Sequence, residues 1–158
     1  MRAIILCLIM GLTPALALAA DAKPTPDEVK RVLDYYYHGK GMGPVLIETK
    51  ICRDVQREGD DKGECAGDIT GQSVKKSDSV YLWMAYMAPN GNEPQSIIVQ
   101  FDVNGITRSV KNVQVPGQLR HRTWLKTTFD KVGAWKIKII QDTGTSAVEL
   151  GTRDVTVE

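Results

Sequence analysis

Histidine can exchange protons near neutral pH with an unperturbed pKa, so the two histidines are the first candidates for chemistry. His38 follows a run of tyrosines, and His121 lies in the basic and aromatic segment 120–126. No recognisable metal-ligand spacing surrounds either imidazole, which predicts no metal and no cofactor. A hydrolase of envelope polymer that pairs an Asp or Glu carboxylate with His121 is an alternative function, because such a pair needs only proximity in the fold.

Nucleophilic catalysis has no recognisable motif in this sequence. There is no G-x-S-x-G element, and the acidic pair Asp60 and Asp61 lies in a polar, glycine-flanked run that water solvates. The glycine-rich run 39–43 follows a predicted helix and therefore lacks the helix N-terminus that binds phosphate. We predict that the protein is not an enzyme.

Aromatic rings beside cations offer binding chemistry without catalysis. Residues 35–37 are consecutive tyrosines, and helical neighbours point about 100° apart, so at least one ring must stay near the surface. Segment 120–126 combines cations with an indole, which favours either a cation stacked on tryptophan at a sheet edge or a ligand site. Capture of a small ligand or glycan is a further alternative, and it requires two exposed coplanar rings. The predicted binding residues are Tyr35, Tyr37, Arg120, His121, Arg122 and Trp124.

The first residues have the composition of a secretory signal peptide. Arg2 precedes an apolar stretch that a glycine and a proline interrupt, and the stretch ends in Ala-Leu-Ala. It is shorter than the ~20 apolar residues that cross a bilayer, and no later segment reaches that length. We predict a signal peptide at 1–19 with cleavage near Ala19/Ala20, no stable membrane anchor, and a periplasmic or secreted product.

Export changes how the cysteines are interpreted. Cys7 lies in the predicted signal peptide, which leaves Cys52 and Cys65 in an oxidising compartment. An even number of cysteines there predicts a disulfide, and two thiolates without further ligands fall short of a zinc site. The bond would close the polar run between the two cysteines, which cannot bury itself.

The composition and charge of the chain are typical of one globular domain. The 158 residues are 42% hydrophobic and 25% charged, with 20 Lys and Arg against 19 Asp and Glu. This near balance gives no bulk electrostatic reason to expect nucleic acid or an anionic membrane as a partner. We predict neither of them.

A helix begins near residue 25. Thr25, Pro26 and Glu28 have the form of a capping box with proline in the first turn. An apolar stripe follows at helical spacing, and the glycines at 39–43 end the helix. Residues 20–43 are thus a leader, a helix and a glycine-rich connector. The stripe consists of Val29, Val32, Leu33 and Tyr36.

The pattern changes to a period of two after residue 44, which predicts strands. About seven candidate strands are separated by turn signals, of which Asn104-Gly105 is the strongest hairpin signal. Without alternating helices, residues 44–158 are predicted to form an antiparallel, immunoglobulin-like β-sandwich with one N-terminal α-helix. The candidate strands are 45–52, 79–87, 96–103, 106–115, 120–127, 134–141 and 148–157.

Alternation also assigns the faces of individual strands. Trp135, Ile137 and Ile139 are expected to face the core, while the lysines between them face water. The strand at 79–87 is apolar on both faces, which is typical of a central strand. We expect the N-terminal helix to cover its second face.

Several short motifs resemble an uncharacterised family of bacterial extracytoplasmic β-domains. They are I-C-R-D-V at 51–55, V-Y-L-W-M at 80–84, R-T-W at 122–124, G-A-W-K-I at 133–137 and V-T-V at 155–157. The resemblance covers about the last two-thirds of the chain and implies a Gram-negative envelope setting and no catalytic residues. Its framework positions here are Arg122, Trp124, Gly133 and Trp135.

These observations favour one function over the alternatives. A rigid two-sheet scaffold without convergent catalytic groups is typical of a binding module. We therefore expect an exported, non-enzymatic module that binds a protein or a cell-envelope component.

Overall fold

The computed structural model describes residues 25–37, 43–88 and 93–158. The predicted signal peptide 1–19, most of the glycine-rich connector and His38 lie outside the described residues. The described elements are α1 (Pro26–Tyr37), β1 (Val45–Val55), β2 (Cys65–Asp68), β3 (Ser79–Met87), β4 (Gln95–Val103), β5 (Ile106–Val115), β6 (His121–Thr128), β7 (Gly133–Asp142) and β8 (Ala147–Val157).

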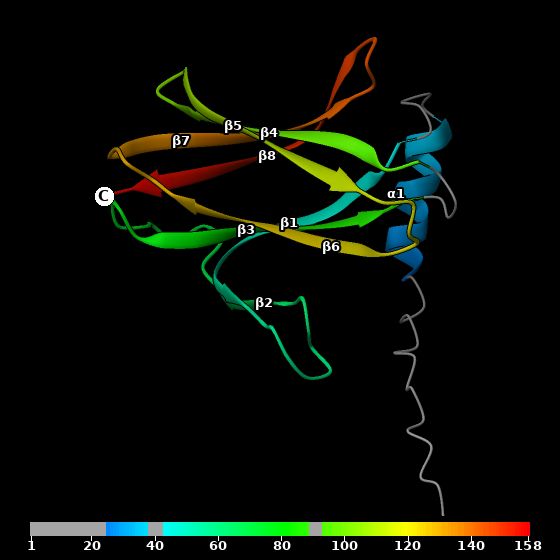
Figure 1. Ribbon diagram of the computed structural model, residues 1–158, viewed down its shortest axis with the longest axis horizontal. Helices are drawn as coiled ribbons and strands as arrows, with labels where there is room; N and C mark the ends of the chain where they lie inside the picture. The colour runs from blue at the N-terminus through cyan, green and yellow to red at the C-terminus, as the bar shows by residue number, and fades with distance from the viewer. Residues whose placement is uncertain (1–24, 38–42, 89–92) are drawn as a thin grey trace, which may run out of the picture.

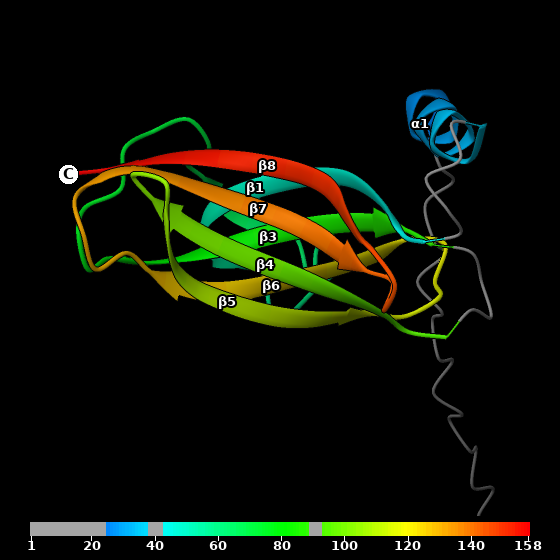
Figure 2. The same cartoon turned by 90° about the horizontal axis from the view of Figure 1, so that it is seen from above.

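The strands form two antiparallel sheets that pack face to face, as the sequence predicts (Figures 1 and 2). One sheet has the strand order β2-β1-β3-β6 and the other has the order β5-β4-β7-β8. Each sheet pairs strands that are not neighbours in the chain, as in immunoglobulin-like sandwiches. The prediction of an antiparallel, immunoglobulin-like sandwich with one N-terminal helix is confirmed.

The core lies between the two sheets and contains the inward-facing residues of alternating strands. Trp135, Ile137 and Ile139 on β7 are buried, as predicted. Burying each aliphatic side chain of this kind stabilises the fold by about 1.5–3 kcal/mol. Other fully buried members of this core are Leu82, Met84, Tyr86, Ile97, Val99, Phe101, Val115 and Phe129.

The hairpin predicted between β4 and β5 is confirmed. Val103 pairs with Ile106, and the two residues between them have positive φ, 51° at Asn104 and 79° at Gly105. Two left-handed residues match the twist of a two-residue hairpin, which explains why this dipeptide indicates the turn.

A segment after β2 closes the sandwich at its C-terminal end. Val74 forms a parallel bridge with Val157, and its backbone N–H donates to the carbonyl of Thr156 at 2.9 Å. The N–H of Glu158 in turn donates to the carbonyl of Val74 at 3.0 Å. The last residues of β8 are thereby tied to the chain that leads into β3.

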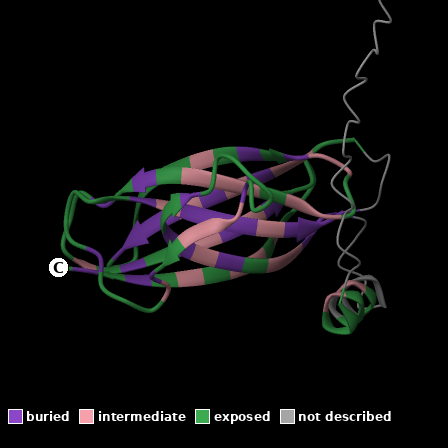
Figure 3. Ribbon diagram, turned by 90° about the horizontal axis from the view of Figure 1, so that it is seen from below, coloured by how far each residue is buried: buried purple, intermediate pink, exposed green. Residues whose placement is uncertain are grey.

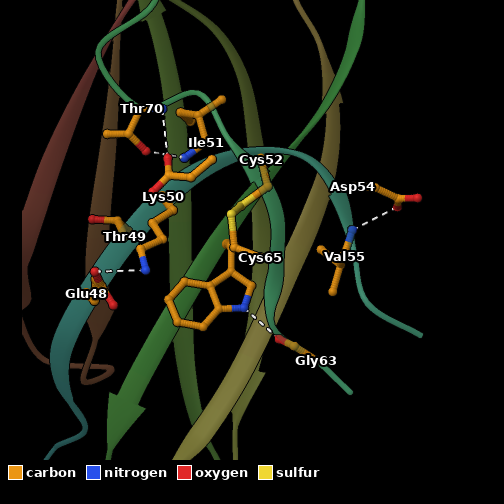
Figure 4. Close-up of a disulfide and its surroundings, with 12 residues drawn as sticks. Glu48, Thr49, Lys50, Ile51, Cys52, Asp54, Val55, Gly63, Cys65 and Thr70 are labelled. Carbon is orange, nitrogen blue, oxygen red and sulfur yellow. Dashed lines mark hydrogen bonds and ion pairs between the residues drawn. A yellow bond between two sulfur atoms is a disulfide. The ribbon is translucent and has the colours of Figure 1, made fainter. Parts of the chain in front are cut away.

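The face of β3 that points away from the core is covered at Trp83 by the loop between β1 and β2, not by α1. Trp83 is 3% exposed and packs with Cys52 and Val55, and its indole N–H donates to the carbonyl of Gly63 at 2.7 Å. The predicted disulfide between Cys52 and Cys65 is confirmed and closes this loop (Figure 4). We call residues 56–64 the disulfide loop.

Two sequence expectations are therefore wrong. The expected cover of β3 by the helix fails because the disulfide loop already occupies that surface. The eighth strand, β2, escaped prediction because four residues are too few to establish an alternating pattern.

Helix α1 lies at one end of the sandwich, where it packs on β1 (Figure 2). The predicted capping box is present, since the N–H of Thr25 donates to Oε2 of Glu28 at 2.7 Å. Most described residues of the helix are exposed, including Val29 at 40% and Leu33 at 50% (Figure 3). Two members of the apolar stripe expected to pack on the sandwich, Val29 and Leu33, are thus in contact with solvent.

Candidate functional site

A polar pocket of about 210 Å³ lies where α1, the disulfide loop and the outer face of one sheet meet. Three of the predicted binding residues, Arg120, His121 and Arg122, line it together. They do so because β6 begins at His121, so the chain is still turning at Arg120 and the strict alternation of a strand does not yet apply. We call this hollow the end pocket. Its remaining lining residues are Glu28, Ile47, Glu48, Glu64, Trp83, Ala85, Tyr86 and Met87.

Strand pairing explains the hollow. On the outer face of the sheet, Ala85 on β3 lies opposite Glu48 on β1 and opposite Arg122 on β6. A methyl group in the central strand leaves open space between two long charged side chains. In the next outward-facing row Trp83 occupies the corresponding place, opposite Lys50 and Trp124, and fills it.

Both arginines of the end pocket are paired with carboxylates that come from outside the two-sheet framework. Nη2 of Arg120 lies 3.1 Å from Oε1 of Glu28 on α1. Nη2 of Arg122 lies 2.7 Å from Oε1 of Glu64, the last residue of the disulfide loop. Arginine forks recognise carboxylate and phosphate oxygens with the same geometry. The framework therefore presents two oxyanion-binding groups, and the chain's own glutamates occupy them.

His121 is half-buried at the start of β6. Its Nδ1 is 3.2 Å from Oε1 of Gln118, and burial lowers the pKa of its imidazole. The three carboxylates that line the same pocket bind other groups. Glu28 pairs with Arg120, Glu64 with Arg122 and Glu48 with Lys50. Within the described residues, His121 thus has an amide partner where a hydrolase would place a carboxylate.

Trp124 has a packing role. Its ring is partly buried against Cys52, Val55 and Trp83, and a Cβ added at Gly63 would lie 3.7 Å from it. The disulfide loop therefore lies directly on the indole.

Two cations lie over aromatic rings of β3. Lys50 Nζ lies 5.3 Å from the ring centroid of Trp83. The Arg57 guanidinium lies 5.6 Å from the ring of Tyr81.

The remaining predicted residues, Tyr35 and Tyr37, belong to α1, but their side chains lie outside the description. Among the aromatic side chains that the structure does describe, every ring is buried or half-buried. The pair of exposed coplanar rings needed for glycan stacking is therefore absent from the described part of the chain.

Sequence reasoning missed the acidic half of the end pocket. Glu28 was interpreted only as a helix-capping residue, and it performs both tasks, with its Oε2 at the cap and its Oε1 on Arg120. Glu64 was part of a polar run with no periodic pattern. Its position beside Cys65 was the available signal, because a disulfide places its neighbours on the sheet.

Hollows larger than the end pocket occur elsewhere on the molecule. One of about 450 Å³ adjoins the end pocket, shares Glu28, Ile47 and Glu48 with it, and is also lined by Arg153. Another, of about 480 Å³, lies on the outer face of the second sheet and includes Asp102. A third, of about 360 Å³, is lined by residues 73–75 and 78–80 and by Glu158, among others.

Asp102 is buried, but its carboxylate is satisfied by the protein. It accepts from Gln100 Nε2 and Thr107 Oγ1, both at 2.8 Å, and pairs with Lys138 at 2.9 Å. Burial acts to raise the pKa of this carboxyl, but the hydrogen bonds from Lys138, Gln100 and Thr107 outweigh it and lower the pKa.

In residues 25–37, 43–88 and 93–158, no group of three His, Cys, Asp or Glu side chains is placed to hold a metal ion. Over the same ranges, no helix has the length and apolar character needed to cross a membrane.

Comparison with known proteins supports the fold. No protein-family model and no curated protein matches the chain. The C-terminal domain of Wzt has a similar solved structure, with a TM-score of 0.51 and 13% identity over 75% of each chain. A CARDB domain from Pyrococcus furiosus, crystallised with di-metal ions, gives a TM-score of 0.40 and 17% identity over 73% of this chain and 90% of that one. The first likeness places the chain among immunoglobulin-like β-sandwich domains.

Proposed function

We propose that the chain is an exported, non-enzymatic module that binds a protein or another component of the bacterial cell envelope through the end pocket. The observation that carries the proposal is the convergence of Arg120, His121 and Arg122 on one open, polar pocket. Residues predicted as binding groups from their types alone lie side by side at a sheet end, where rigid strands commonly present a recognition surface.

The chemistry of the end pocket supports binding over hydrolysis. Its arginines are ion-paired and its imidazole is hydrogen-bonded to Gln118, so the described groups provide hydrogen-bond donors and charges without an acid–base pair. Such a pocket recognises a charged group on a partner and leaves the covalent bonds of that partner intact.

The disulfide supports the export part of the proposal. Cys52 is fully buried, and its bond to Cys65 holds the disulfide loop against the sheet. Structural disulfides form and persist in oxidising compartments such as the bacterial periplasm. N-terminal sequencing of the native protein tests export directly, with a first residue near Ala20 as the expected result and a first residue of Met1 as the contrary one.

A capture experiment tests the binding function. Disulfide-bonded protein on beads, incubated with a bacterial envelope extract, is expected to retain the same component reproducibly, and Arg122→Gln to reduce its recovery at least about fivefold, the loss of a typical charge-assisted contact. Arg108→Gln is the matched control, because Arg108 makes a comparable surface pair with Asp130 on the far side of the sandwich. Equal recovery by both variants would exclude the end pocket as the binding surface.

A further inference from the structure

We infer that the end pocket is an oxyanion site that the chain keeps self-occupied: Glu28 holds the place on Arg120 that a phosphate or carboxylate group of the partner takes on binding. The inference rests on the proposed function, which it deepens by naming the chemical class of the recognised group. The class includes tetrahedral phosphate groups and planar carboxylate groups, and both present pairs of oxygens that suit an arginine fork.

The arginines of the end pocket and the carboxylates paired with them come from different parts of the fold. Arg122 lies on β6 and Arg120 immediately precedes it, so the framework strands set the positions of both guanidinium groups. Glu28 comes from α1 and Glu64 from the disulfide loop, neither of which belongs to the two-sheet core. The two arginines are thus part of the scaffold, and the carboxylates paired with them are supplied by appendages. The third carboxylate that lines the pocket, Glu48 on β1, pairs with Lys50 instead.

The two appendages are attached to the framework in different ways. The disulfide loop is fixed beside Glu64 by the Cys52–Cys65 bond and by the hydrogen bond from Trp83 to Gly63. Helix α1 has no disulfide, and among its described side chains Glu28 joins it to the framework through the ion pair with Arg120. Its substantial contact with a strand is with β1, and Val29 and Leu33 of its apolar stripe are exposed. An isolated helix of 12 residues has only marginal stability in water.

The ion pair between Glu28 and Arg120, which an incoming oxyanion would replace, is partly sheltered from water. The side chain of Glu28 is 14% exposed and that of Arg120 is 26% exposed. Partial shelter from water makes such a pair stronger than a pair at the open surface. An incoming oxyanion replaces one sheltered ion pair with another, so its binding is weak in the wild type and strengthens when the internal carboxylate is neutralised.

The variant Glu28→Gln isolates this exchange. Glutamine at the third helical position retains the capping box, so the substitution removes the negative charge and keeps the helix start. Asp27→Asn is the matched control. It removes the same charge from the adjacent residue of α1, which borders the adjoining hollow and is not among the residues lining the end pocket.

The test is a titration with inorganic phosphate at low ionic strength, followed by ¹H–¹⁵N NMR of backbone and arginine side-chain signals. Glu28→Gln is expected to bind phosphate about fivefold more tightly than the wild type, the factor equivalent to about 1 kcal/mol for a lost ion pair. Asp27→Asn is expected to change the affinity less than twofold. The double variant Glu28→Gln/Arg120→Gln should lose the gain in phosphate affinity. In Glu28→Gln, the chemical-shift changes caused by phosphate should map to residues 120–122.

A parallel titration with acetate distinguishes the two sources. Tighter binding of phosphate than of acetate assigns a phosphorylated partner group, and the reverse order assigns a carboxylate. Equal effects of Glu28→Gln and Asp27→Asn, or shifts that map elsewhere, would overturn the inference, because the charges would then act only at long range. If Arg122→Gln still abolishes capture in that case, the proposed function stands without the exchange.

Discussion

The strongest stability prediction concerns the disulfide loop. Replacing both Cys52 and Cys65 with alanine opens a loop whose ends are 13 residues apart in sequence. The chain-entropy relation for that length gives about 3 kcal/mol of stabilisation, because the closed loop restricts the unfolded chain. A domain of this size is stable by about 5–15 kcal/mol, so the loss is a substantial fraction of the total.

Equilibrium unfolding in urea measures this effect. The double variant is expected to unfold at a midpoint lower by at least about 1 M, taking a slope of about 1–3 kcal/mol per molar for small proteins. Wild-type protein unfolded in the presence of a reductant is the control, because it lacks the bond and keeps the native side chains. A loss below about 0.5 kcal/mol in both samples would refute the idea that the bond holds the loop on the sheet.

The disulfide variant also connects stability to the site. Glu64 is adjacent to Cys65 and binds Arg122 at 2.7 Å, so an open loop should release that carboxylate. Trp83 should then become accessible, since the loop covers its indole. Red-shifted tryptophan fluorescence in the folded double variant is the expected sign of this release.

Two further predictions follow from burial. Leu82→Ala removes a fully buried side chain from the central strand β3 and should destabilise the fold by about 2–5 kcal/mol in urea unfolding, whereas Leu33→Ala on the exposed helix stripe should cost under about 1 kcal/mol. Burial lowers the folded pKa of His121 below its value of about 6.5 in the unfolded chain, so the unfolded state binds more protons as the pH falls. Stability should therefore decline below about pH 6.5, and His121→Gln should show a smaller decline between pH 7.5 and 5.5; equal pH dependence in both proteins would contradict the burial of the imidazole.

In the end pocket, the arginines and their partner carboxylates belong to different parts of the fold. The sheets provide a rigid set of donors, and the parts outside the sheets provide the groups that neutralise them. A partner that carries an oxyanion would need to displace only a helix, without any change in the sandwich. Binding could then be reported by α1, for example as faster amide exchange in residues 27–37 when phosphate is added.

Much of the sandwich follows from local patterns. The inward residues of β7 and the two-residue turn at Asn104 were predictable because alternation and positive φ are properties of a few consecutive residues. The disulfide was predictable because two cysteines remain after the predicted signal peptide is removed. The strand β2 was not, since its four residues pair with β1 through contacts that leave no periodic trace.

The amino-acid sequence by itself determined the fold class, the strands other than β2 and the basic residues that could bind a partner. Only the tertiary structure decided what those residues meet. Glu28 lies 92 residues from Arg120 in the chain, and no local rule relates positions at that distance. Strand pairing, the disulfide and the contact of α1 with β1 bring such residues together, and the energy of those long-range contacts is a property of the assembled fold.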